Sequence, residues 1–78
     1  MYEVNWLFFM NSLWIPFDYK NQIFLEDAFI LKGTFVDLED SHFPETRKVR
    51  VFPKQDYLCY LGVRYRLSRI MLPKYIMR

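Results

Sequence analysis

Side chains that could carry catalysis are sparse in this sequence. It holds one histidine, His42, and one cysteine, Cys59, and it has no glycine-rich phosphate loop. A zinc site needs about four converging ligands, so these two residues would require several carboxylates as well. Asp37, Glu39 and Asp40 lie close together and could hold a cation, although a solvated acidic loop is the simpler interpretation. We therefore expect no catalytic residue, no metal site and no cofactor.

The charges divide the sequence into an acidic part and a basic part. Residues 1–45 carry eight acids and two bases, a net charge of −6, whereas residues 46–78 carry one acid and nine bases, a net charge of +8. Arg64 and Arg66 alternate with apolar residues in the basic part, so they would share one face of a strand. The division indicates either an anionic partner or two parts that neutralise each other after folding.

The composition is that of one small domain with a dense core. The chain has 78 residues, of which 53% are hydrophobic and 21% aromatic. A domain of this size buries only about 60% of its unfolded surface, so aromatic side chains must supply much of the core. A single cysteine excludes an internal disulfide and favours an intracellular location, cytoplasmic or nuclear. The longest run without charge, 4–17, is too short for a transmembrane segment.

One helix and several strands are expected. Residues 4–9 and 14–17 are rich in strand-forming residues and favour a hairpin. A helix is predicted over 22–31, with Asn21 as its N-cap and Gly33 as its stop. Because so short a helix is marginal alone, its apolar stripe should face a sheet. The predicted stripe is Phe24, Leu25, Ala28, Phe29 and Leu31.

The second half favours an antiparallel meander. Residues 34–46 form an acidic loop that can hold a short extended piece at 35–38. Three or four strands are predicted after it, from the segments 48–52, 57–61, 63–67 and 74–78. The order of a hairpin, a helix and a meander predicts an α+β domain. We expect an antiparallel half-barrel sheet of about five to six strands packed around one α-helix.

The sequence also resembles the WWE domain family over residues 6–29. Trp6 is followed by Trp14-Ile15-Pro16-Phe17-Asp18 and then by Leu25-Glu26-Asp27-Ala28-Phe29, the spacing of the two tryptophans and the glutamate that name the family. The Trp-x-Pro-Phe form also resembles the WWE-like segment of DDHD phospholipases. We expect Trp6, Trp14, Leu25 and Glu26 to be structural, with both tryptophan rings in the core.

Two alignments extend the resemblance beyond residue 29. In the first, Phe35-Val36-Asp37-Leu38 takes the place of a family strand of the form Tyr-x-Val-Asp-Leu. In the second, 49–51 is the first strand after the helix, 57–61 takes the Tyr-x-Val-Asp-Leu place and 74–78 is the final basic strand. We prefer the second alignment because it uses the whole chain.

The ligand-binding members of the family hold iso-ADP-ribose, a unit of poly(ADP-ribose), in an aromatic slot. Tyr57 matches a family tyrosine of this slot, Arg66 stands where glutamine is common, and Lys74 lies near a family arginine. Phe8 lacks the hydroxyl of a second family tyrosine, and Ile15 replaces an aromatic residue. The resemblance therefore implies a weakened slot.

The resemblance implies a non-catalytic interaction module. We expect residues 1–78 to be a single WWE-like domain of a larger protein of the ubiquitin pathway or of lipase type, with another protein or another domain as partner. The alternative is binding of poly(ADP-ribose), iso-ADP-ribose or another polyanion through the basic part. The ligand-binding residues would be Phe8, Ile15, Tyr57, Arg64, Arg66 and Lys74.

Overall fold

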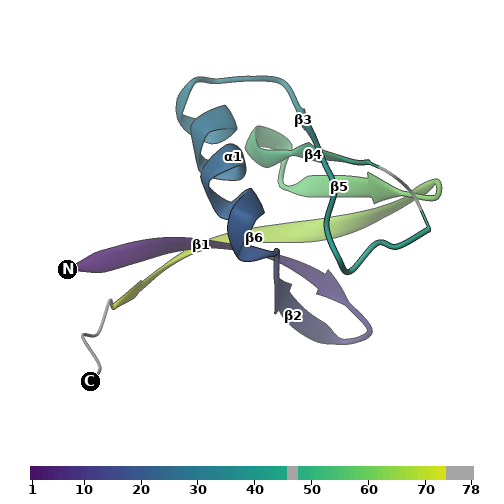
Figure 1. The fold of residues 1–78 in the computed structure, drawn as a ribbon, viewed down its shortest axis with the longest axis horizontal. Helices are drawn as coiled ribbons and strands as arrows, with labels where there is room; N and C mark the ends of the chain where they lie inside the picture. Colours follow the sequence, from purple (N-terminus) through teal and green to yellow (C-terminus); the bar gives the residue numbers. More distant parts are fainter. Residues whose placement is uncertain (46–47, 74–78) are drawn as a thin grey trace.

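The computed structural model describes residues 1–45 and 48–73 and has an α+β fold with one α-helix and one sheet (Figure 1). The sheet is open, antiparallel and six-stranded, in the order β2-β1-β6-β5-β4-β3. The elements are β1 (Tyr2–Met10), β2 (Leu13–Pro16), α1 (Tyr19–Ile30), β3 (Val36–Leu38), β4 (Val49–Phe52), the 3-10 helix η1 (Pro53–Gln55), β5 (Tyr57–Tyr60) and β6 (Val63–Pro73). The predicted fold class is confirmed at this level, and the sheet is compatible with a half-barrel. No helix in the described ranges is long and apolar enough to cross a membrane.

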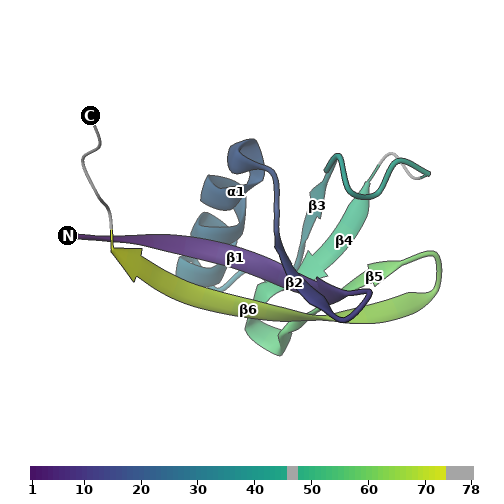
Figure 2. The ribbon, with the colours of Figure 1, turned by 90° about the horizontal axis from the view of Figure 1, so that it is seen from below.

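A long ribbon of β1 and β6 forms the middle of the sheet. Two-residue turns join β1 to β2 at Asn11 and Ser12, and β5 to β6 at Leu61 and Gly62. All four turn residues have a positive φ, which a type I′ hairpin turn requires. Figure 2 shows α1 on one side of the ribbon, and the end that carries the N-terminus projects beyond the helix.

The core fills the space between the sheet and α1. Trp6 and Phe8 point into it from β1, and Val49 and Val51 point into it from β4, as strand alternation predicts. The other buried apolar residues are Phe17, Leu25, Leu38, Phe43, Leu58 and Leu67. Phe43 packs on Phe8 with ring centroids 4.8 Å apart, so the loop after β3 covers part of the core.

The helix begins earlier than the sequence analysis predicted. Its N-cap is Asp18, and Asn21 lies buried in the first turn, so the prediction of Asn21 as the N-cap was wrong. The Asn21 amide donates instead to Asp40 Oδ1 and to the backbone oxygen of Glu39, both at 2.8 Å. The Asn21 side chain therefore binds residues far along the chain and does not cap the helix.

The buried face of α1 also differs from the predicted stripe. Leu25 is buried as expected, whereas Phe24 and Leu31 are exposed. Phe29 reaches the core and packs edge-on against Trp6, with ring centroids 5.4 Å apart. Asn21 takes a buried place that apolar spacing alone does not assign, because its side-chain nitrogen donates two hydrogen bonds to Glu39 and Asp40 after β3.

The strands correct the preferred alignment to the WWE family. Val36–Leu38 forms β3 and pairs with β4, so 49–51 is not the first strand after the helix. Val36 and Leu38 pack against the core, which explains why three residues suffice for a strand. β6 continues past Leu67 to Pro73 because this whole stretch pairs with β1. The predicted strand 74–78 lies outside the described residues.

Trp14 is not a core residue, contrary to the expectation. It stands on the edge strand β2 and is 43% exposed, whereas Trp6 is 1% exposed. Its cross-strand partner is Phe9, with ring centroids 5.1 Å apart. On β2 the alternation turns Ile15 toward the core, and Trp14 therefore faces the opposite side of the sheet.

Candidate functional site

A hydrogen-bonded group of Trp6, Glu26 and Arg69 ties α1 to the central ribbon. The Trp6 indole N–H donates to Glu26 Oε1 at 2.9 Å. Arg69 donates to both oxygens of the same carboxylate, from Nε at 3.0 Å and from Nη2 at 2.6 Å. A buried indole N–H requires an acceptor, and Glu26 supplies it while also neutralising Arg69. This group therefore fixes the helix across two strands.

Gln22 forms a second set of hydrogen bonds between α1 and β1, which the sequence did not predict. Its Oε1 accepts from the backbone N–H of Trp6 at 2.6 Å, and its Nε2 donates to the backbone oxygens of Trp6 and Phe17, both at 3.1 Å. The side-chain amide thus bonds the strand as a neighbouring peptide group would. A glutamine on a helix gives no sequence signal for this role.

Acidification is expected to destabilise the protein through Glu26. Hydrogen bonding from Arg69 is the largest effect on this carboxyl and outweighs desolvation, so its pKa lies below the ordinary 4.5. A carboxyl with a lowered folded-state pKa contributes stability that is fully present above its ordinary, unfolded-state pKa. This stability is lost as the pH falls through the folded-state pKa. Thermal melts from neutral pH into this acidic range should show the loss. Glu26→Gln should reduce the pH dependence, and an unchanged dependence would contradict the role given to Glu26.

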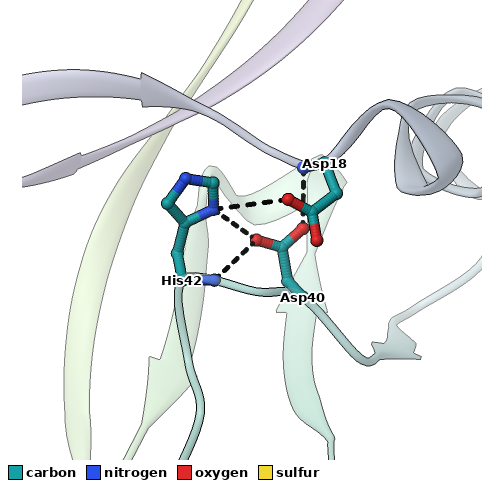
Figure 3. Close-up of side chains that lie close together, drawn as sticks. All are labelled: Asp18, Asp40 and His42. Atoms are coloured by element: carbon teal, nitrogen blue, oxygen red, sulfur yellow. Dashed lines mark hydrogen bonds and ion pairs between the residues drawn. The ribbon is translucent and has the colours of Figure 1, made fainter.

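Asp18 at the start of α1 forms a cluster with Asp40 and His42 of the loop after β3 (Figure 3). Asp40 Oδ1 accepts from the backbone N–H of Asp18 and from the Asn21 amide, both at 2.8 Å. Asp40 Oδ2 accepts from the backbone N–H of His42 at 3.3 Å and lies 2.6 Å from His42 Nδ1. Ser41 donates twice to Asp18 and lowers the pKa of that carboxyl.

Protein donors therefore occupy the carboxylate oxygens of this cluster. A cation would have to displace them, so the arrangement fits a fastening between the start of α1 and the loop after β3 better than a metal site. Asp37, which the sequence analysis grouped with Asp40, lies apart from it. Asp37 accepts two hydrogen bonds from Arg50, at 2.9 and 3.0 Å, and joins β3 to β4.

The described residues predicted to form the ligand slot fall into two groups on opposite faces of the sheet, with Phe8 paired to Ile15 and Tyr57 paired to Arg66. Phe8 is 0% exposed and cannot touch a ligand, while Ile15 is half-buried against the same core. Tyr57, Arg64 and Arg66 lie on the opposite face of the sheet. Lys74, the sixth residue of the prediction, lies outside the described residues.

One row of side chains crosses this opposite, outer face of the sheet. Phe9 is directly opposite Trp14, and Tyr57 is directly opposite both Arg66 and Phe52. Continuing the β1–β6 and β3–β4 registers by one residue places Phe9 beside Arg66 and Phe35 beside Phe52. We call this the outer-face row; in spatial order it is Trp14, Phe9, Arg66, Tyr57, Phe52 and Phe35.

Three arginines lie against rings of the outer-face row. The guanidinium carbon is 3.9 Å from the Phe35 ring centroid for Arg50, 4.3 Å from that of Tyr57 for Arg64, and 6.0 Å from that of Trp14 for Arg66. Arg50 is neutralised by Asp37. Arg64 and Arg66 form no ion pair with any acid within residues 1–45 and 48–73. The basic part is thus neutralised at Arg50 and Arg69, while these two arginines keep their charge available.

A groove of about 370 Å³ lies between α1 and β1, on the inner face. We call it the helix groove; it is lined by Glu3, Val4, Tyr19, Lys20, Gln22, Ile23 and Glu26. The inner face of the projecting ribbon continues it, because Met71 is paired with Val4 and Tyr2 is two residues further along. Tyr2 and Met71 are both exposed. The inner face therefore offers an apolar surface next to the helix.

Comparisons of the chain with family models, with curated proteins and with solved structures gave no match. The resemblance to the WWE family thus stands on the spacing of Trp6, Trp14 and Glu26. The structure adds one physical relation among these positions, the hydrogen bond from Trp6 to Glu26.

Proposed function

We propose that the chain is a non-catalytic interaction module of WWE type. Its partner is another protein, or another domain of a larger protein of the ubiquitin pathway or of lipase type. The fold class and the Trp6–Glu26 hydrogen bond agree with the spacing from which the resemblance was inferred. The surface next to α1 supports a role in protein contact.

The observation that carries this proposal is the exposure of apolar side chains around the helix groove. Tyr19 is 84% exposed, Ile23 58% and Ile30 60%. At 3.6 residues per turn these three residues lie on one side of α1. Tyr2 and Met71 extend the apolar surface along the ribbon end that projects past the helix in Figures 1 and 2. A contiguous exposed apolar patch marks an interaction site.

The helix groove favours a partner segment with apolar side chains on one face. Such a segment, an amphipathic helix or a strand, would place these side chains between Val4 and Ile23. Burial of apolar surface contributes about 25 cal/mol per Å² in such a contact. Glu3 and Lys20 at the lining leave polar groups of both signs to set the orientation of the segment.

Ile23→Asp is expected to weaken partner binding at least tenfold, because it places a carboxylate in a contact that buries apolar side chains. A photo-crosslinker at position 23 of the intact parent protein should identify the partner, and calorimetry with that partner should measure the loss. Leu61→Asp is the matched control, since Leu61 is also exposed but lies in the β5–β6 turn. Equal binding by both variants and the parent protein would refute the groove as the interface.

A second candidate function is the binding of a polyanion such as poly(ADP-ribose). The available charges of Arg64 and Arg66 favour it. Because Phe8 is in the core and Tyr57 faces the other side of the sheet, a polyanion would meet the outer face and not the slot that the family uses.

A further inference from the structure

We infer that the outer-face row binds single-stranded nucleic acid, with bases stacked on Trp14 and Phe9 and phosphates paired with Arg64 and Arg66. This inference rests on the second candidate function and names its ligand. It uses the face of the sheet opposite to the helix groove, so it can succeed or fail independently of the protein-interaction proposal.

The outer-face row is long enough for several nucleotides. It crosses five strands and ends at Phe35, one residue before β3. Neighbouring strands lie about 4.8 Å apart, so the row spans about 24 Å. Trp14, Phe9 and Phe35 are exposed along it, and Tyr57 and Phe52 are half-buried. Aromatic rings on an open sheet face are platforms on which bases of any sequence can stack. Trp14 and Phe9 are the available platforms of the row, because Arg64 lies over Tyr57, Tyr57 stacks on Phe52, and Arg50 lies over Phe35.

The two available arginines are placed to hold phosphates beside these rings. Arg64 lies over the Tyr57 ring and Arg66 faces the Trp14 ring, so each guanidinium group is oriented before a ligand arrives. A stacked guanidinium keeps the N–H donors at its edge free for phosphate oxygens. Two residues along one strand are about 6.8 Å apart, a separation suited to neighbouring phosphates of an extended strand.

The combination of rings and arginines favours a single strand over other anionic ligands. An acidic peptide would pair with the arginines but would leave the rings without planar partners. A duplex presents its phosphates while its bases remain stacked inside. A single strand offers both groups at once, and its bases are free to reach Trp14 and Phe9.

The test is a titration with fluorescein-labelled oligo-dT and oligo-U of about ten nucleotides, followed by fluorescence polarisation. Trp14→Ala should weaken binding about tenfold or more, because it removes one stacking platform. Arg66→Gln should also weaken binding and should reduce the slope of log affinity against log salt by about 0.7, the value for one phosphate of a single strand. Tyr19→Ala is the matched control on the other face and should bind like the parent chain.

Tryptophan emission gives a second readout. Trp6 is buried, so quenching on addition of unlabelled oligo-dT should come from Trp14 and should vanish in Trp14→Phe while binding persists. Absence of binding at low salt would overturn the inference. If duplex or heparin bound as tightly as oligo-dT, and Trp14→Ala did not change this binding, the outer-face row would be a purely electrostatic patch. Binding of poly(ADP-ribose) or of anionic vesicles without binding of oligonucleotides would assign another ligand, and loss of binding in Tyr19→Ala alone would place the ligand on the inner face.

Discussion

Trp6→Ala is expected to lower the free energy of unfolding by about 3–5 kcal/mol. The Trp6 ring is almost completely buried, it packs edge-on against Phe29, and its indole N–H donates to Glu26. Its removal would leave a cavity beneath α1 and would take one hydrogen bond from the carboxylate that also holds Arg69. Small domains are stable by only about 5–15 kcal/mol, so the variant should unfold at a much lower urea concentration, measured by circular dichroism.

Trp14→Ala provides the matched comparison, since the same residue type is removed from the other face of the sheet. We expect a loss of about 1 kcal/mol or less, because Trp14 contributes one cross-strand contact with Phe9 and remains partly in water. Losses of equal size in the two variants would show that the assignment of one tryptophan to the core and the other to the surface is wrong.

Local patterns in the sequence were sufficient to predict the class of fold. Strand-forming residues predicted strands at 4–9 and 48–52, and these agree with β1 (Tyr2–Met10) and β4 (Val49–Phe52). Two residues, Asn11 and Ser12, connect β1 to β2, and the two strands form the hairpin predicted from residues 4–9 and 14–17. These features depend only on neighbours along the chain, which is why a single sequence reveals them.

Local patterns failed where the partner of a residue lies far along the chain. Asn21 has the chemistry of an N-cap, but Asp40, nineteen positions away, takes its amide, and Asp18 takes the N-cap position. Trp14 was expected in the core because of its size, although alternation on β2 assigns that side to Ile15. Tertiary hydrogen bonding therefore outweighed the capping preference of Asn21, and strand geometry outweighed the tendency of a large ring such as Trp14 to be buried.

The candidate surfaces were even less accessible to prediction. The outer-face row depends on the registers of five strand pairs, and the β1–β6 pair joins residues as distant as Tyr2 and Pro73. The arginines themselves were predicted to share a face, and they do, but their aromatic neighbours Trp14 and Phe9 come from the other end of the chain. The helix groove likewise depends on the rotation of α1 about its axis. The predicted stripe placed Phe24 against the sheet, whereas Phe24 is exposed.

Asp40→Ala is expected to lower the free energy of unfolding by about 2–4 kcal/mol, because it leaves one buried and two partly buried donors without this acceptor. The Asp40 side chain is 0% exposed. It accepts from the backbone N–H groups of Asp18 and His42 and from the Asn21 amide, so it joins the start of α1 to the loop after β3. Loss of this fastening should also expose amides of the first helical turn to hydrogen exchange.

Two comparison variants make the Asp40 prediction specific. Glu39→Ala removes a neighbouring carboxylate that is exposed, and it should change the free energy of unfolding by no more than about 0.5 kcal/mol. Asp40→Asn keeps one acceptor oxygen but turns a donor toward the donors on its other side, so its loss should lie between those of the two alanine variants. Denaturant unfolding of the three variants measures this order directly. If Asp40→Ala were as stable as Glu39→Ala, the cluster in Figure 3 would not be a structural fastening, and its carboxylates would have to be reconsidered as a binding site.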